Sequence, residues 1–570
     1  MKNRLFLMGL VLAASQLAVA ADTGPDPDAM FKQAQTLLGN KQYQEAAKLL
    51  ESVTERAPER APAWLALGRA REALGQVDPA GKAFARAADN AATQAPAVRA
   101  AFLLYAGNGR RDEAFTWYQR ARHTPLIDLS GLASSPKVGK LADDPRFGDL
   151  FPARIKFEPP FVENVRIIQE WRGGNAGDEF GWEARGVGDL DGDGATDVVI
   201  SAPAHPPQGD GAGHVYVFSG KSGKLLWKHS GSGFELLGNS VESAGDINRD
   251  GVPDVIAGAP GKQAAYVYSG KDGALLLTLS GEKGDEGFGT HSAGIGDFNG
   301  DNVPDLIVAA PSSQKPGAGS PDYRGRAYVF SGKTGKTLLR LEGKAGGDQF
   351  GSAVSGRDGR FFVVGSAGAG KHHAGRVYVY DKLSAVPAFT IDADATGGGL
   401  GYMFVSVMGD ANHDGVPDIY ASDWLNKARG GMTGRIYVYS GKSGKELLML
   451  TGTTTGEGFG IGPAHTGDVD GDGHDDLVVG SWQYGKAAWS GGRVGVYSGS
   501  DGHLLQSFTG KVPGETLGFD AVGVGDVDGD GNTDFLVTSA WSLVNGVRSG
   551  RAYILAGNGG KAAKKTEHSM

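Results

Sequence analysis

The sequence is organised around one stretch, Asp526-Val527-Asp528-Gly529-Asp530-Gly531-Asn532-Thr533-Asp534. Acidic side chains at its first, third, fifth and ninth positions suit neither a core nor one face of a helix, but a tight loop brings them to one point. Calcium takes six to eight oxygen ligands, and an Asp-x-Asp-x-Asp-Gly start is how a short loop supplies them. The apolar run Phe535-Leu536-Val537 follows, so we expect a β-strand after the loop and not the helix of an EF-hand.

Five further copies of the pattern precede this one, with asparagine replacing aspartate only at the third position. Amide oxygens also ligate calcium, and six copies in phase argue against simple solvated turns. In one copy Asn302 replaces the usual glycine, and asparagine tolerates a positive φ better than most residues. The predicted calcium ligands are Asp189, Asp191, Asp193 and Asp197; Asp246, Asn248, Asp250 and Asp254; Asp297, Asn299, Asp301 and Asp305; Asp410, Asn412, Asp414 and Asp418; Asp468, Asp470, Asp472 and Asp476; and Asp526, Asp528, Asp530 and Asp534.

The amino terminus has the features of a secretory signal peptide. Lys2 and Arg4 precede a short apolar run, and Ala18-Val19-Ala20 is typical of a cleavage site. We therefore expect residues 1–20 to be removed on export, which places the mature protein in the periplasm, outside the cell or on its surface. No later segment reaches the length of a transmembrane helix. The chain has no cysteine, so core burial or metal must stabilise it in place of disulfides, and the acidic loops suggest metal.

Neither the charge nor the motifs indicate nucleic-acid binding or catalysis. The formal net charge is −9, and this acidity is mostly stored in the six loops, which argues against a nucleic-acid surface. The run Ser219-Gly220-Lys221-Ser222 resembles part of a phosphate-binding loop, but the upstream glycine is missing and the pattern predicts a hairpin turn. The sequence has no Gly-x-Ser-x-Gly nucleophile motif and no cysteine nucleophile. We expect no enzymatic activity.

Residues 27–122 repeat with a period of 34 residues and are rich in helix-forming residue types. The run Trp64-Leu65-Ala66-Leu67-Gly68, followed by Ala80 and Phe84, resembles the tetratricopeptide signature. The small residues let paired helices approach closely, and the large ones fill the space between them. Such a stack either binds a peptide in its concave groove or serves as a spacer, and both interpretations stay open. Residues 123–160 are predicted to be a linker with one short helix.

Residues 161–560 repeat in units of 50–62 residues that share one internal order. Each unit has a Phe-Gly or Leu-Gly pair, then the acidic loop or its remnant, and the pattern of four short strands that is typical of a β-propeller blade. The fold class is therefore multidomain, with an all-α tetratricopeptide-like stack, an all-β seven-bladed propeller and a disordered tail at 561–570. The seven pairs begin at Phe180, Leu237, Phe288, Phe350, Leu400, Phe459 and Leu517.

The units resemble the FG-GAP repeats of integrin α-subunit propellers, through the Phe-Gly pair, the acidic loop and the motif Gly258-Ala259-Pro260. The resemblance covers residues 161–560 and implies calcium in the loop between the first two strands of a blade. It also implies an extracellular protein or glycan partner, so we expect an interaction or adhesion protein. The alternatives are an accessory protein of glycan- or lipid-directed hydrolases or lyases, and a scaffold for an envelope complex.

The repeat departs from its pattern at its two ends and in the fourth unit. The last unit stops after its third strand, at 551–555, and an extra strand at 165–171 precedes the first unit. We expect these two strands to pair and close the ring, which leaves no free edge. The fourth unit carries Arg357-Asp358-Gly359-Arg360 in place of the acidic loop, and we expect it to bind no calcium.

The loop after the second strand has proline in the first three units and tryptophan in the last three. Because a strand has two ends, these loops must lie on the face opposite the calcium loops. Two interpretations stay open: the rings pack between blades, or they form a binding surface for a protein or glycan, since aromatic residues on surface loops often carry recognition. The ligand-binding residues of the second interpretation are Trp424, Trp482, Tyr484, Trp489 and Trp541.

Overall fold

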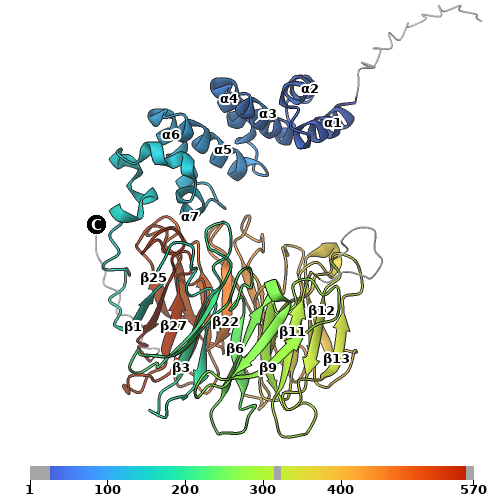
Figure 1. Ribbon diagram of the computed structural model, residues 1–570, viewed down its shortest axis with the longest axis vertical. Helices are drawn as coiled ribbons and strands as arrows, with labels where there is room; N and C mark the ends of the chain where they lie inside the picture. Colours follow the sequence, from blue (N-terminus) through green and yellow to red (C-terminus); the bar gives the residue numbers. More distant parts are fainter. Residues whose placement is uncertain (1–25, 313–322, 560–570) are drawn as a thin grey trace, which may run out of the picture. The chain divides into compact units, whose positions relative to one another are not determined.

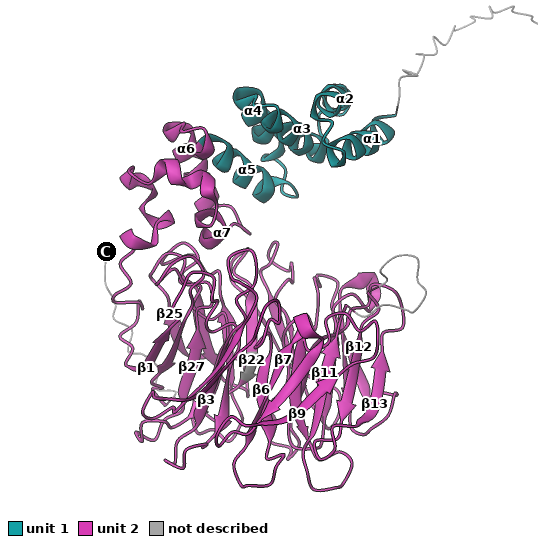
Figure 2. Ribbon diagram, viewed as in Figure 1, with its two compact units in different colours: residues 1–105 teal, residues 106–570 magenta. Residues whose placement is uncertain are grey.

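The computed structural model describes residues 26–312 and 323–559. The chain divides into two compact units, residues 1–105 and 106–570 (Figure 2). The predicted signal peptide at 1–20 and the predicted tail at 561–570 lie outside the described residues. Within the described ranges, no helix has both the length and the apolar character needed to cross a membrane.

The first unit is a stack of paired helices (Figure 1), as the 34-residue period predicts. Helices α3 and α4 meet at Gly68, where a Cβ atom would lie 2.4 Å from ring carbons of Phe84. Glycine is therefore required at this contact, and the buried ring of Phe84 fills the space between the helices. The helices of this unit are α1 (Pro27–Gly39), α2 (Tyr43–Arg56), α3 (Ala61–Ala73), α4 (Val77–Ala87) and α5 (Gln94–Gly107), which ends two residues inside the second unit.

The second unit begins with short helices and continues into the propeller. Its helical segment contains α6 (Arg111–Arg122), α7 (Leu129–Ala133) and the 3₁₀ helices η1 (Pro136–Leu141), η2 (Pro145–Leu150) and η3 (Pro152–Arg154). Buried Phe147 packs against Tyr118, with their ring centroids 5.3 Å apart. Residues 106–160 thus have a core of their own and group with the propeller in one compact unit.

The described part of the propeller consists of seven four-stranded antiparallel sheets (Figure 1). First strands of neighbouring blades pack on one another around the centre of the ring. The first four blades are β2 (Ala184–Gly188), β3 (Asp197–Ala202), β4 (His214–Phe218) and β5 (Leu225–Ser230); β6 (Val241–Gly245), β7 (Asp254–Ala259), β8 (Ala264–Tyr268) and β9 (Leu275–Ser280); β10 (His291–Gly296), β11 (Asp305–Ala310), β12 (Arg326–Phe330) and β13 (Thr337–Glu342); and β14 (Phe350–Gly356), β15 (Phe362–Ser366), β16 (Arg376–Tyr380) and β17 (Phe389–Asp392).

The last three blades include the one that closes the ring. They are β18 (Val405–Val407), β19 (Ile419–Asp423), β20 (Arg435–Tyr439) and β21 (Glu446–Thr451); β22 (Phe459–His465), β23 (Leu477–Ser481), β24 (Arg493–Tyr497) and β25 (Leu504–Thr509); and β26 (Ala521–Gly525), β27 (Asp534–Thr538), β28 (Arg551–Leu555) and β1 (Ile167–Arg172).

Ring closure occurs as predicted, because β1 pairs antiparallel with β28 and completes the seventh sheet in the order β1-β28-β27-β26. Trp171 lies opposite Ala552 in this register. Arg551, which is fully buried, donates from Nε to Oε1 of Glu170 on β1 over 2.9 Å. The ladder and this ion pair join strands that are far apart in the sequence.

The Phe-Gly and Leu-Gly pairs are the joints between blades. Gly181 has a φ of 88°, and a Cβ atom there would lie 2.9 Å from Cβ of Thr538 in the neighbouring blade. Glycine suits this position because it adopts a positive φ without strain and leaves room for the neighbour. All seven large partners are at most 4% exposed: Phe180, Leu237, Phe288, Phe350, Leu400, Phe459 and Leu517.

Candidate metal loops and the opposite face

The acidic loops connect the first and second strands of their blades and fold around their first aspartate. In the loop between β2 and β3, Asp189 Oδ1 accepts hydrogen bonds from the backbone N–H groups of Gly192 (2.7 Å) and Asp193 (3.1 Å). Its Oδ2 accepts from the N–H of Gly194 (2.9 Å). The loop ending at Asp534 has the same set of bonds, with Asp526 as acceptor. The backbone therefore fixes the turn before any ion is considered.

The ninth position is the most buried of the set. Asp197 Oδ2 accepts from the N–H of Leu190 (2.7 Å), and its Oδ1 accepts from the N–H of Gly220 (3.1 Å). Burial raises the pKa of Asp197 to about 6, because the charged form loses water. The six equivalent side chains, all with no exposed surface, are Asp197, Asp254, Asp305, Asp418, Asp476 and Asp534.

In three of the acidic loops, the carboxylate oxygens are placed to fit a calcium ion. In three loops, carboxylate oxygens of the first, third and ninth positions lie within 4.8 Å of one another, which leaves room for one shared cation. In a fourth loop, the buried Oδ1 of Asn412 has no hydrogen-bond partner among the described residues. An all-oxygen set with several carboxylates suits a hard cation. The three carboxylate groups are Asp189, Asp191 and Asp197; Asp468, Asp470 and Asp476; and Asp526, Asp528 and Asp534.

Arginines replace or supplement the loops at two places. In the fourth blade Arg360 donates from Nη1 to the carbonyl of Gly415, in the acidic loop of the fifth blade, over 2.8 Å. In the seventh blade Arg166 pairs with Asp528, and its Nη2 lies 2.8 Å from Oδ2 of Asp530. Arg360 and Arg166 thus each contact an acidic loop directly.

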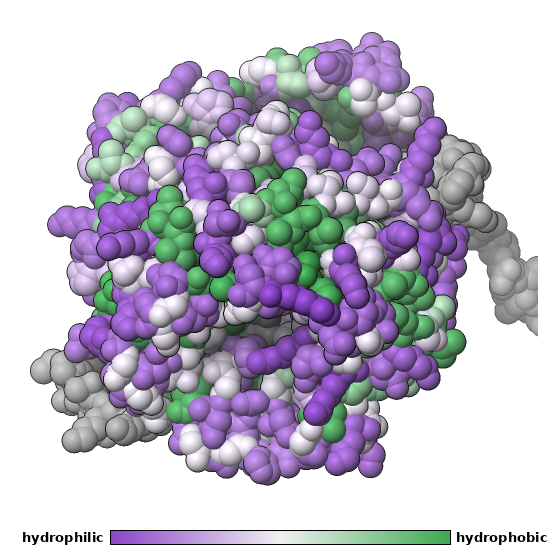
Figure 3. Space-filling view, turned by 60° about the horizontal axis from the view of Figure 1, so that its bottom comes forward, coloured by the Kyte–Doolittle hydropathy of each residue, from purple (hydrophilic) through white to green (hydrophobic). Residues whose placement is uncertain are grey.

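The face that carries the acidic loops is hollowed at its centre. Figure 3, seen from below Figure 1, shows a mainly hydrophilic face with a hollow in its middle. A cavity of about 560 Å³ lies there, lined largely by the glycine-rich ends of first strands and by Arg357 and His465. Nη1 of Arg357 lies 3.0 Å from Nδ1 of His465. Burial and this guanidinium lower the pKa of His465 to about 4.

The three tryptophans that follow second strands lie side by side in blades five to seven. The ring centroid of Trp482 is 6.4 Å from that of Trp424 and 4.7 Å from that of Trp541. Trp482 is 7% exposed, whereas Trp424 and Trp541 are half-buried. The guanidinium of Arg548 lies 3.9 Å from the ring centroid of Trp541. The cluster combines an interior ring with two partly exposed ones.

Trp489 and Tyr484 lie in different surroundings from these three. Trp489 is 7% exposed, donates from Nε1 to the carbonyl of Ile127 (3.0 Å) and packs 5.4 Å from the ring of Tyr118. The helical segment of the second unit therefore covers it. Tyr484 is half-buried, with the guanidinium of Arg493 5.5 Å from its ring.

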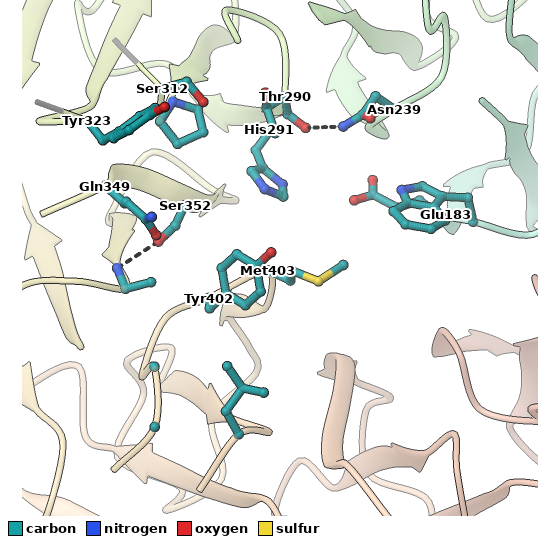
Figure 4. A pocket seen from close by; sticks show the side chains of 16 residues that line it. Glu183, Asn239, Thr290, His291, Ser312, Tyr323, Gln349, Ser352, Tyr402 and Met403 are labelled. Atoms are coloured by element: carbon teal, nitrogen blue, oxygen red, sulfur yellow. Dashed lines mark hydrogen bonds between the residues drawn. The ribbon is translucent and has the colours of Figure 1, made fainter. Parts of the chain in front are cut away.

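A second cavity lies at the centre of the face opposite the acidic loops, and the sequence analysis did not identify its residues. It has a volume of about 600 Å³, and Figure 4 shows Glu183, His291 and Tyr402 around it. These residues occupy the first or second position after a Phe-Gly or Leu-Gly pair. The sequence signal that could have identified them is their fixed place directly after each pair, where the residue type varies from blade to blade.

The fold and the loops agree with the similarity to known proteins. Residues 189–257, 246–308 and 468–537 match the FG-GAP-like repeat, residues 288–330 match the FG-GAP repeat, and residues 37–102 match the tetratricopeptide repeat. The chain thus joins tetratricopeptide repeats to an integrin α-like propeller of FG-GAP repeats.

Several integrin α subunits are similar to part of the chain. Integrin alpha-6 of Gallus gallus is 35% identical over 147 residues, which cover 23% of this chain and 13% of that protein. Integrin alpha-PS5 of Drosophila melanogaster is 34% identical over 27% of this chain and 17% of that protein. Integrin alpha-11 of Homo sapiens is 34% identical over 26% of this chain and 14% of that protein. The alignments therefore span less than a fifth of these relatives.

Proposed function

We propose that this chain is an exported, calcium-binding adhesion or interaction protein without catalytic activity. It works in the periplasm, outside the cell or on its surface, and it binds a partner protein on the propeller face opposite the acidic loops. The observation that carries this proposal is the division of the two faces. One face holds acidic loops whose oxygens fit calcium, and the other holds the cluster of Trp424, Trp482 and Trp541.

Calcium has a structural role in this proposal. Each ion would be held by the carboxylate or amide oxygens at positions one, three, five and nine of its loop, and it would supply the positive charge that the crowded carboxylates lack. Because each acidic loop joins the first and second strands of a blade, neutralising the loop stabilises the blade. The mutual repulsion of unscreened carboxylates opposes folding, and binding to the folded state alone stabilises it by mass action.

The partner-binding role rests on the aromatic cluster. Its inner ring, Trp482, packs 5.6 Å from Phe519 and holds the outer rings in place. Rigid, partly exposed tryptophans offer a large contact area at low entropic cost and are enriched among residues that dominate binding energies. The similarity to integrin α subunits favours a protein partner, and the tetratricopeptide groove is a second candidate surface for a peptide. A glycan is the second candidate partner for the propeller face, favoured by the central cavity.

Binding of the purified chain to an array of extracellular and envelope proteins tests the proposal, with and without chelator. We expect at least one protein of the array to bind this chain when calcium is present. The Trp541→Ala substitution should weaken the binding free energy by about 2 kcal/mol or more. The matched control is Phe234→Ala, since Phe234 is 63% exposed and follows the fourth strand of a blade on the same face. Equal affinity of the Trp541→Ala and Phe234→Ala variants would contradict the proposed surface.

A further inference from the structure

The central cavity on the face opposite the acidic loops has the features of a small-molecule site. Its volume of about 600 Å³ is within the range of ligand pockets, roughly 300–1,000 Å³. Five blades contribute to its lining, and Figure 4 shows the side chains of Glu183, His291 and Tyr402 turned toward the same space. A pocket assembled from separate blades is preformed when the ring is closed.

The lining offers hydrogen bonds without a net positive charge. Among the described lining residues there is neither lysine nor arginine, and Glu183 is the only carboxylic acid. Burial and the charge of Arg185 lower the pKa of His291 to about 4, so its ring is neutral at neutral pH. Among these described lining residues, anionic ligands such as phosphates, sulfates and uronates find no lysine or arginine to pair with, which disfavours them.

Glu183 has one engaged and one available oxygen atom. Its Oε2 accepts a hydrogen bond from the N–H of Val241 over 2.9 Å. Its Oε1 has no hydrogen bond to any residue that the structure describes, although the side chain is only 12% exposed. Burial raises the pKa of Glu183 to about 8, against the opposing charge of Arg185, whose Nη2 lies 4.0 Å from Oε2, so the protonated carboxyl is populated at neutral pH. A protonated carboxyl can both donate and accept, which suits a hydroxyl group better than a cation.

Two aromatic rings flank these polar groups, and each ring packs against a further aromatic side chain. Trp182 packs 5.1 Å from Phe519, and Tyr402 stacks 6.0 Å from Trp424. Tyr402 is 37% exposed. Flat rings beside neutral polar groups match a ligand that has apolar C–H faces and many hydroxyl groups, since aromatic side chains combine an apolar surface with fixed geometry.

We propose that this pocket binds an uncharged saccharide, with Trp182 and Tyr402 contacting the sugar faces and Glu183 and His291 bonding its hydroxyl groups. The inference deepens the proposed function, on which it rests for the use of this face, and it names the chemical class of a ligand. Short neutral oligosaccharides fit the volume and the described lining, which has neither lysine nor arginine.

The test uses the full chain, loaded with calcium, and titration calorimetry. The probes are neutral oligomers of glucose, galactose, mannose and N-acetylglucosamine, with galacturonate oligomers, glucosamine oligomers and tetralysine as charged counterparts. We expect at least one neutral oligomer to bind, and binding to weaken about tenfold or more in Trp182→Ala and in Tyr402→Ala. Glu183→Gln, which keeps hydrogen bonding, should weaken binding less than Glu183→Leu does.

Controls separate a local effect from unfolding. Phe234→Ala removes an exposed ring that does not line the cavity and should leave saccharide affinity unchanged. Because Tyr402 is partly exposed, its replacement tests the site even if Trp182→Ala lowers stability, and thermal melting of each variant shows which case applies.

Three outcomes overturn the inference. The first is that no neutral oligomer binds at about 10 mM. The second is that glucosamine oligomers or tetralysine bind more tightly than neutral oligomers and that Glu183→Gln abolishes this preference. The third is that neither aromatic substitution changes the affinity for a neutral oligomer. If no neutral oligosaccharide binds while partner-protein binding is intact, only the saccharide site is rejected. If Trp541→Ala weakens protein binding while saccharide binding is intact, the result supports the protein-binding surface of the proposed function and leaves the saccharide site unaffected.

Discussion

Replacing the arginine at the closure of the ring should destabilise the propeller far more than replacing its counterpart in the fourth blade. Arg551 begins β28 and has no exposed side-chain surface. Its Nε lies 2.9 Å from Glu170 on β1, its Nη2 lies 3.0 Å from Glu158, and its Nη1 lies 3.6 Å from Glu515. One side chain therefore joins the closing strand to the blade that it completes.

The size of the effect follows from what Arg551→Met leaves behind. Glu515 is 1% exposed, and it would keep only the hydrogen bonds from Tyr553 (2.8 Å) and Ser542 (2.9 Å). Breaking a buried ion pair by removing one partner costs about 3–5 kcal/mol, because a buried charge stays uncompensated. A double variant, Arg551→Met with Glu515→Gln, removes that charge and should recover about 1–3 kcal/mol.

The fourth blade supplies a matched control. Arg376 begins β16, the third strand of that blade, and its Nε lies 2.5 Å from Asp392. Because both side chains are partly exposed, at 27% and 49%, Arg376→Met should cost only about 0–1 kcal/mol. Urea unfolding in calcium, followed by tryptophan fluorescence, measures both losses, and hydrogen exchange on 167–172 shows whether β1 detaches. Equal losses in the two variants would refute the closing role of Arg551.

Three further measurements follow from the metal loops, the helical stack and the central pocket. Chelation of calcium should lower the melting temperature of the propeller in calorimetry and leave the first unit nearly unchanged; unchanged melting of both would contradict structural calcium. Gly68→Val should destabilise the helical stack by about 1–3 kcal/mol in urea unfolding, through overpacking against Phe84. The control is Gly39→Val, which should not show this packing penalty because no neighbouring atom lies within 4 Å of a Cβ at Gly39. Because burial raises the pKa of Glu183 to about 8, its contribution to stability is present at low pH and lost as the pH rises toward 8, so the wild type should lose stability relative to Glu183→Gln between about pH 5 and 8.

Periodic features of the sequence predicted most of the propeller. The Phe-Gly and Leu-Gly pairs recur because every blade needs a buried side chain and a glycine at its joint, as Phe180 and Gly181 show. The proposed calcium role accounts for the recurrence of the acidic loops, since each loop would place oxygens around one ion. Ring closure was predictable because the seventh unit lacks a fourth strand, and β1 supplies it.

Features that depend on one residue from each of several blades escaped prediction. The burial of Trp489 under the segment around Ile127 joins positions that no local pattern connects. The pocket residues Glu183, His291 and Tyr402 differ in type at equivalent positions, so they form no repeat motif. For Trp424, Trp482 and Trp541, the sequence predicted only that they lie on the same face of the propeller. It could not predict how buried each ring is, because burial depends on the neighbouring side chains.

The two ends of a first strand connect the metal loops with the central pocket. In the first blade, β2 spans Ala184–Gly188, with Glu183 directly before it and Asp189 directly after it. The same order holds in the third blade, where β10 begins at His291 and ends just before Asp297. A cation that fixes the loop at one end of such a strand also limits the motion of the pocket residue at the other. Preorganised side chains lose less entropy when a ligand binds, so the proposed calcium on one face would support the proposed recognition on the opposite face through five or six residues of strand.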